Sequence, residues 1–107
     1  MIIQINSDNH IHTNVEFSNR ISDAAKSGLK RFEGNLSRVD IYFADENKAK
    51  RGIEDKKCTI EAKLTMFHPE AVSFKADTLD EAFNGAMEKL KHLLGTKMDQ
   101  LKDHYKH

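Results

Sequence analysis

The sequence predicts an α+β fold, in which a four-stranded, mainly antiparallel sheet carries two helices on one face. Residues 39–43 and 58–64 alternate apolar and polar side chains, which indicates half-buried strands. Residues 17–32 and 79–101 repeat apolar side chains at three- and four-residue steps, the pattern of amphipathic helices. The elements follow the order β-α-β-β-β-α. Because 107 residues is close to the commonest domain size, we expect residues 1–107 to form a single domain.

The first strand and the first helix come from the N-terminal third of the chain. Residues 1–6 alternate in the manner of a strand. Thr13 followed by Glu16 fits a capping box, in which the hydroxyl accepts from an amide in the first turn and the carboxylate returns to the cap amide. Gly34 and Asn35 are typical of a helix end. The apolar stripe of this helix comprises Phe17, Ile21, Ala24, Ala25, Gly28, Leu29 and Phe32.

Three strands are expected in the middle of the chain, at residues 38–44, 57–66 and 71–76. A polar loop, residues 45–57, joins the first two, and Pro69 precedes the third. The loop is either a functional contact or a tolerated extension of the hairpin. The face away from the helices is a mixed charged and hydroxyl surface without the paired aromatics of a base-stacking RNA-recognition sheet. It would expose Asp40, Tyr42, Thr59, Glu61, Lys63, Ser73 and Lys75.

The last helix is the longest element that the sequence predicts. Thr78 and Glu81 form a second capping-box candidate, next to acidic residues that favour a helix N-terminus. Gly95 is expected to interrupt the helix, because a mid-helix glycine costs about 1 kcal/mol relative to alanine. One face of the helix holds Leu79, Phe83, Ala86, Leu90, Leu94 and Leu101.

The composition indicates a soluble cytoplasmic protein. No apolar run approaches the roughly 20 residues that span a bilayer, and the N-terminus has no secretory pattern. The single cysteine, Cys58, cannot form an internal disulfide and is expected as a small buried thiol. Seventeen Lys and Arg balance seventeen Asp and Glu, so net charge neither supports nor opposes a local basic patch. Three methionines are expected to fill the core, namely Met66, Met87 and Met98.

Three stretches in this order carry a resemblance to a known family. The first is Leu29-Lys30-Arg31-Phe32 followed by Leu36-Ser37-Arg38-Val39. The second is Asp45-Glu46-Asn47, Asp55-Lys56, Cys58 and Glu61-Ala62. The third is Leu79-Asp80, Ala82, Gly85-Ala86 and Lys89-Leu90. The chain thus resembles, over essentially its whole length, the ribosome hibernation-promoting factor family, also described as ribosome-associated inhibitors and long labelled sigma-factor modulation proteins. The family fold resembles a double-stranded-RNA-binding domain.

The resemblance implies a translation regulator rather than an enzyme. Members of the family bind the small ribosomal subunit, in the channel of messenger and transfer RNA, and block translation under stress or in stationary phase. The implied partner is ribosomal RNA, with no cofactor, small-molecule substrate, membrane or DNA. Basic side chains are the candidate contacts, because each phosphate that they neutralise releases counterions from the RNA. They are Lys26, Lys30, Arg31, Arg38, Lys89, Lys91, His92, Lys97 and Lys102, of which the first four are expected to cluster at the end of the first helix.

The last helix departs from the family pattern. Thr96, Met98 and Gln100 stand where family members often carry bases, and His92 stands where an arginine is usual. One alternative is therefore a protein-interaction or regulatory module of the same fold that has lost strong ribosomal RNA binding. The basic residues would then belong to an ordinary solvated helix face of mixed charge.

Two further patterns suggest chemistry, and each has a plainer interpretation. His10 and His12 could place two imidazoles on one side of an extended segment and hold a metal, but no third and fourth ligands stand at a recognisable spacing. Solvent-exposed residues before a helix are the plainer interpretation. Cys58 as a nucleophile would need a histidine nearby in space, which a sequence does not show. We therefore expect no metal site and no catalytic residue.

Overall fold

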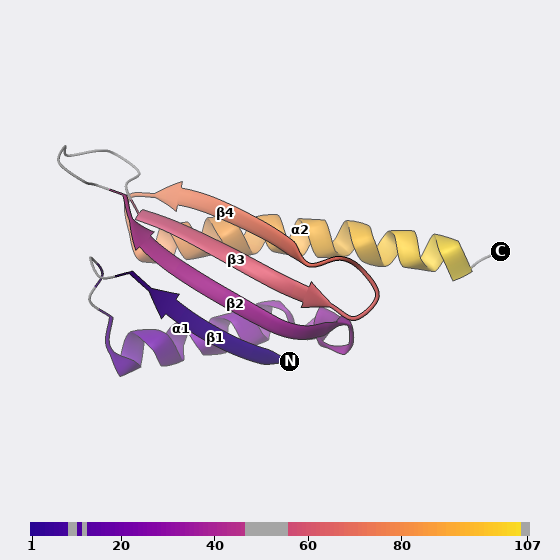
Figure 1. The fold of residues 1–107 in the computed structure, drawn as a ribbon, viewed down its shortest axis with the longest axis horizontal. Helices are drawn as coiled ribbons and strands as arrows, with labels where there is room; N and C mark the ends of the chain where they lie inside the picture. Colours follow the sequence, from indigo (N-terminus) through magenta and orange to yellow (C-terminus); the bar gives the residue numbers. More distant parts are fainter. Residues whose placement is uncertain (9–10, 12, 47–55, 106–107) are drawn as a thin grey trace.

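The structure is a computed structural model that describes residues 1–8, 11, 13–46 and 56–105, with side chains to residue 100 (Figure 1). Its elements follow the predicted order, with a short 3₁₀ helix, η1, added after the first α-helix. They are β1 (Ile2–Ser7), α1 (Val15–Gly28), η1 (Lys30–Asn35), β2 (Leu36–Asp45), β3 (Lys56–Leu64), β4 (Glu70–Ala76) and α2 (Leu79–Tyr105).

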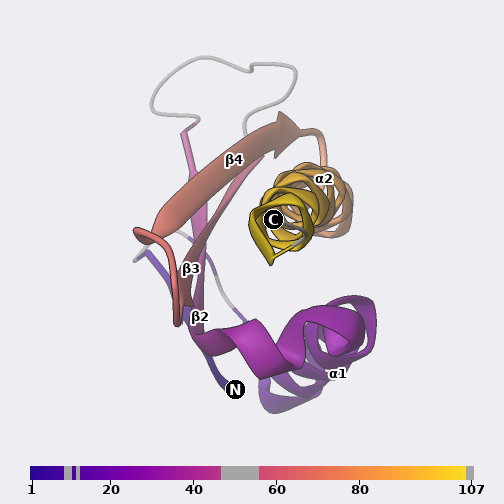
Figure 2. The same ribbon diagram turned by 90° about the vertical axis from the view of Figure 1, so that its right-hand side faces the viewer.

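The four strands form one sheet in the order β1-β2-β3-β4. The pairing of β1 with β2 is parallel, because α1 returns the chain to the starting end of the sheet, and the other two pairings are antiparallel. Both helices lie on the same face of the sheet, and none of the described residues forms a helix on the opposite face (Figure 2). The predicted α+β fold is therefore confirmed. Within the described residues, no helix combines the length and apolar character needed to cross a membrane.

The first helix begins and ends differently from the prediction. Asn14, and not Thr13, is the N-cap, and its side chain accepts a hydrogen bond from the amide of Phe17 at 2.8 Å. Asparagine is a more favourable N-cap residue than threonine, and this accounts for the difference. The α-helix ends at Gly28 instead of near Gly34, and the chain tightens into η1. The tighter turn brings Phe32 into the core with 2% of its surface exposed.

The second helix starts as predicted and runs further than predicted. The Thr78 hydroxyl accepts from the amide of Glu81 at 3.1 Å and donates to its carboxylate at 3.0 Å. The helix then continues through Gly95 without a break, so the expected interruption is wrong. Leu90 and Leu94 are fully buried just before this glycine, and tertiary packing of this kind outweighs a low intrinsic propensity.

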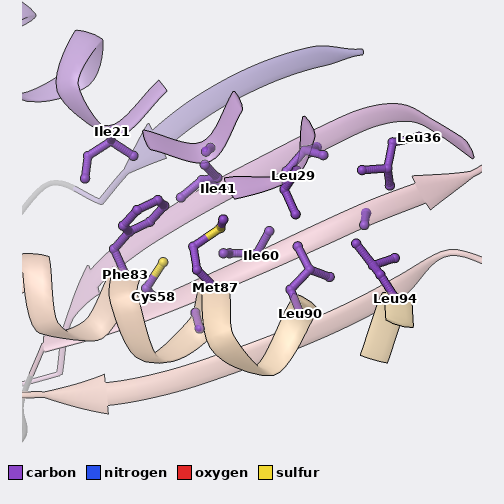
Figure 3. Packing of buried hydrophobic residues seen from close by; sticks show 14 of the residues in the cluster. Ile21, Leu29, Leu36, Ile41, Cys58, Ile60, Phe83, Met87, Leu90 and Leu94 are labelled. Carbon is purple, nitrogen blue, oxygen red and sulfur yellow. The ribbon is translucent and has the colours of Figure 1, made fainter. Parts of the chain in front are cut away.

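The core lies between the sheet and the two helices (Figure 3). Residues from alternate positions of β2 and β3 meet the apolar stripes of α1 and α2, as the two periodicities predict. Met87 is buried and Met98 packs against the core, but Met66 is 57% exposed because it lies in the turn after β3 ends. The largest fully buried side chains of this core are Phe32, Phe43, Ile21, Leu29, Ile41, Ile60, Leu90, Leu94, Val39 and Cys58.

The face of the sheet without helices differs from the prediction at Asp40. This carboxylate was expected to be exposed, yet only 8% of the residue is accessible. The guanidinium of Arg38, two residues earlier on the same face, donates to Asp40 Oδ2 at 2.8 Å and covers it. A charge can lie at this depth because it is paired and hydrogen-bonded.

Helix α2 packs closely on β4 where Gly85 faces the ring of Phe74. A Cβ atom added at Gly85 would lie 2.1 Å from the nearest ring carbon, which is far inside van der Waals contact. The glycine therefore sets the distance between the helix and the edge of the sheet. By contrast, a Cβ added at Gly34 in η1 would meet nothing within 4 Å.

We expect Gly85→Ala to lower the free energy of unfolding by about 1 kcal/mol. Displacing the Phe74 ring costs about 1–3 kcal/mol by overpacking, more than the roughly 1 kcal/mol gained in helix propensity. Urea unfolding measures this change, with Gly34→Ala as the matched control of little or no effect. In a Phe74→Ala background the space is open, so Gly85→Ala should become stabilising. An equal loss in both backgrounds would contradict this account of the contact.

Candidate nucleic-acid interface

The end of α1 and the middle of α2 are in contact through two glycines. A Cβ atom added at Gly28 would lie 2.7 Å from the Cε atom of Met87. A Cβ atom added at Gly95 would lie 3.2 Å from a guanidinium nitrogen of Arg31. Met87 and Gly95 are eight residues apart, with Lys91 midway, so all three lie along one side of α2. This side of α2 therefore faces α1 and η1, and brings the bases of the two helices near one another.

Three basic side chains, one in the last turn of α1 and two at the start of η1, form what we call the helix-end cluster: Lys26, Lys30 and Arg31. All three residues are exposed. Throughout the part of the chain that the structure describes, none of them forms an ion pair with a carboxylate. The guanidinium carbon of Arg31 lies 4.4 Å from the centroid of the Phe32 ring, which limits its movement. The cluster thus presents three uncompensated positive charges to solvent.

Two further predicted contacts lie on α2, and Lys91 is the one on the side that faces this cluster. The Lys91 ammonium lies 3.1 Å from Glu88 Oε1, one helical turn earlier, so its charge is partly compensated. His92 is exposed, on the side of α2 that also carries Glu88 and Thr96 and that points away from the sheet. Lys91 therefore extends the basic surface from α1 and η1 onto α2, whereas His92 lies on a different side of the helix.

The other two basic side chains described on α2 point away from α1 and toward β4. The Lys89 ammonium donates to the backbone carbonyl of Ser73 at 3.0 Å and lies 5.6 Å from the Phe74 ring centroid. The Lys97 ammonium lies 3.4 Å from Glu70 Oε1 and 5.4 Å from the Phe67 ring centroid. Both side chains therefore hold the helix to the sheet edge, and neither lies beside the helix-end cluster.

The sequence predicts that Arg38 clusters with the basic side chains at the end of α1. The structure places it elsewhere, so this part of the prediction is wrong. Its neighbour Val39 points into the core, so Arg38 projects from the opposite face of the sheet. There it donates to Asp40 and to the side-chain carbonyl of Gln4. The hydrogen bond and the charge of Asp40 raise the pKa of the guanidinium above its ordinary value. Arg38 is thus committed to this ion pair, away from the helices.

The open face of the sheet compensates several of its cations in the same way. Glu46, at the end of β2, lies 2.8 Å from the Lys75 ammonium and 3.4 Å from that of Lys57. The hydrogen bond from Lys75 is the main cause that lowers the pKa of Glu46 below its ordinary value. The open face is therefore a weaker anion-binding surface than the helix side.

One residue that the sequence did not single out joins the two helices at their other end. Arg20 of α1 forms an ion pair with Asp80 at the start of α2, and its guanidinium lies 5.3 Å from the Phe17 ring centroid. The two partners are sixty positions apart, so no local pattern announces the pair. It borders an open hollow of about 340 Å³, lined by Thr13, Asn14, Glu16, Phe17, Arg20 and Leu79.

Several predicted sites lie outside the described residues. They include His10 and His12, most of the loop at residues 45–57, and the side chain of Lys102. Among the residues that are described, no three His, Cys, Asp or Glu side chains gather as metal ligands would.

Cys58 is buried, as the sequence predicted, with none of its surface accessible. Burial alone raises the pKa of the thiol to about 12. A cysteine acts as a nucleophile only as the thiolate, and at neutral pH this side chain is almost entirely protonated. The position therefore suits packing and not catalysis.

We expect Cys58 to resist alkylation in the folded protein, even at pH 9. The unfolded chain has an ordinary thiol, which ionises near pH 8.5, whereas the buried thiol stays protonated until pH approaches 12. Iodoacetamide labelling followed by mass spectrometry should show slow modification in buffer and rapid modification in urea. The same difference in pKa means that stability falls as pH rises above about 8.5. Equal labelling rates in buffer and urea would be incompatible with the buried site.

Comparison with known proteins bears on the fold. No protein-family model and no curated protein sequence matches the chain. A ribosomal subunit interface protein from Coxiella burnetii superimposes with a TM-score of 0.69 at 19% identity, over 92% of this chain and 99% of that one. The N-terminal domain of protein Y from Thermus thermophilus gives a TM-score of 0.68 at 14% identity, over 87% and 94%. The chain therefore has the fold of these two proteins over nearly its whole length, which is the fold that the family resemblance predicted.

Proposed function

We propose that this protein binds the ribosome and regulates translation, as a member of the hibernation-factor family. The observation that carries the proposal is the match of nearly the whole chain to a structure named as a ribosomal subunit interface protein. The match covers 92% of this chain and 99% of that one, so it involves the whole domain and not a local motif.

The helix side is the surface that we assign to ribosomal RNA. The helix-end cluster supplies three exposed cations that form no ion pair with any carboxylate among the described residues. Phosphate contacts of this kind dominate affinity and fix orientation without reading base sequence. The open face of the sheet has exposed Tyr42 but compensates Arg38 and Lys75 with carboxylates. Recognition of RNA shape and backbone from the helix side is therefore the better fit.

The proposed mechanism is steric. A domain of 55 × 26 × 18 Å that occupies the messenger and transfer RNA channel of the small subunit would exclude the RNAs that normally lie there. This needs no catalytic group, and the protonated, buried Cys58 provides none. The small subunit as target, the action under stress or in stationary phase, and the cytoplasmic location all belong to this proposal.

A second function is favoured by the compensation of charge on α2. Lys91 and Lys97 each pair with a glutamate, and the whole chain has no net charge. A protein-interaction module that kept the fold but lost the grip on RNA would look like this. The two functions differ in the expected salt dependence, because binding through phosphates releases condensed counterions and weakens steeply as the salt concentration rises.

We expect Lys30→Glu to weaken binding to purified small ribosomal subunits at least about tenfold, and Lys30→Glu/Arg31→Glu to weaken it further. Each substitution removes a cation and adds an anion next to phosphate. Co-sedimentation at several salt concentrations measures the affinity, and the slope of log affinity against log salt concentration should fall by about one unit per lost contact.

The matched control is Lys63→Glu, the same charge change on an exposed lysine of the open face. It should leave the affinity nearly unchanged. Loss of affinity with Lys63→Glu alone would move the interface to the open face. Absence of co-sedimentation of the unsubstituted chain at low salt would remove the ribosome proposal and leave the protein-interaction module.

A further inference from the structure

In the part of the chain that the structure describes, the sheet ends at the edge strands β1 and β4, and the two edges differ. The edge at β4 is blunted. The Lys89 ammonium donates to the outward carbonyl of Ser73, Pro69 precedes the strand, and the strand itself carries Glu70 and Lys75. Lysine, proline and charge on an edge strand are the usual means by which proteins prevent another strand from pairing there.

Among the described residues, the edge at β1 has none of these protections. The strand reads Ile-Ile-Gln-Ile-Asn-Ser, and no charged residue or proline occurs before Asp8. In a chain with 32% charged residues, this is an unusually neutral exposed strand. Ile2 is 60% exposed. On the inner face, Ile3 and Ile5 are only partly buried, whereas their neighbours in β2 are fully buried.

The backbone of β1 also presents unused hydrogen-bonding groups. The amide of Asp8 donates to the carbonyl of Phe43, which fixes the phase of the parallel ladder. In a parallel pair, alternate residues direct both backbone groups to the neighbouring strand. The groups of Gln4 and Asn6 therefore point to β2, and those of Ile3, Ile5 and Ser7 point outward. In the described part of the chain, no backbone group outside the sheet ladder bonds to these three residues.

The sequence of β1 is complementary to itself when read in the antiparallel direction. If Gln4 lies opposite Gln4 of a second copy, Ile3 lies opposite Ile5 and Ile5 opposite Ile3. These isoleucines are the residues whose backbone groups point outward, so each pair would exchange two hydrogen bonds. Their side chains would also meet on the inner face and complete each other's burial. The glutamines on the axis have amide side chains, which both donate and accept.

We propose that two copies of this chain pair through the free edges of β1, antiparallel about a two-fold axis at Gln4. The occupant is a second copy because the strand is neutral and self-complementary in that register. A two-fold axis perpendicular to the sheet joins the two sheets into one of eight strands and keeps all helices on the same face. The helix-end cluster of each copy stays exposed, since it lies on α1 and η1 and not on this edge.

The first test is the oligomeric state of the full chain. Sedimentation velocity from about 1 to about 100 µM should show a concentration-dependent rise toward twice the 12.3 kDa of one chain. Gln4→Glu should raise the dissociation constant at least about tenfold, because it places two carboxylates directly opposite each other on the axis. In the single chain the new carboxylate keeps its contact with Arg38, so folding is preserved. Gln100→Glu, the same change on the exposed surface of α2, is the matched control.

The second test reads the register. A non-hydrogen-bonded antiparallel pair has Cα atoms about 4.5 Å apart, within the range that a disulfide bridges. Mild oxidation should therefore link Gln4→Cys into a covalent dimer, while Lys63→Cys, in an inner strand of the same face, should remain single. Native Cys58 is buried and does not interfere. A chain that stays monomeric across the concentration range, or a dimer that is indifferent to Gln4→Glu and gives no Gln4→Cys link, would overturn the proposal.

Discussion

The structure depends on the packing of α2 against the inner face of the sheet. Leu90 and Leu94 are fully buried against a surface that includes Ile41 and Ile60, and burial of each such side chain contributes about 1.5–3 kcal/mol. This contact keeps a helix of 27 residues in place on a small domain, and it carries the helix through Gly95. The direction of every base on α2 follows from it, because these leucines fix the rotation of the helix about its axis.

That rotation divides the positive charge of α2 between two surfaces. The side with Met87, Lys91 and Gly95 faces α1 and η1, so its base lies near the helix-end cluster. The side with Lys89 and Lys97 faces β4 and its preceding turn. There the Lys89 ammonium contacts a backbone carbonyl and the Lys97 ammonium contacts a carboxylate, and each also lies near an aromatic ring. A single amphipathic helix therefore provides both a candidate RNA contact and the protection of a sheet edge.

The glycines have a related role at the helix contacts. Gly28 and Gly85 allow close approach of Met87 and Phe74, and Gly95 leaves room for the guanidinium of Arg31. The last of these explains why a residue of low helix propensity occurs in the middle of α2. The propensity cost of about 1 kcal/mol is local, whereas the contact it permits joins the two helices that carry the basic residues.

The sequence by itself determined the order of elements, the faces of the strands and the buried state of Cys58, because periods of 2 and 3.6 are local properties of the chain. It also determined the Thr78–Glu81 cap, whose atoms are three residues apart. The tertiary structure alone decided which bases share a surface. Arg38 follows the helix-end cluster closely in sequence, but it lies on the opposite face of the sheet, where Asp40 pairs with it. The pairing of Arg20 with Asp80 and the contact of Arg31 with Gly95 were decided in the same way, because both join residues that are brought together only when the two helices pack on one sheet.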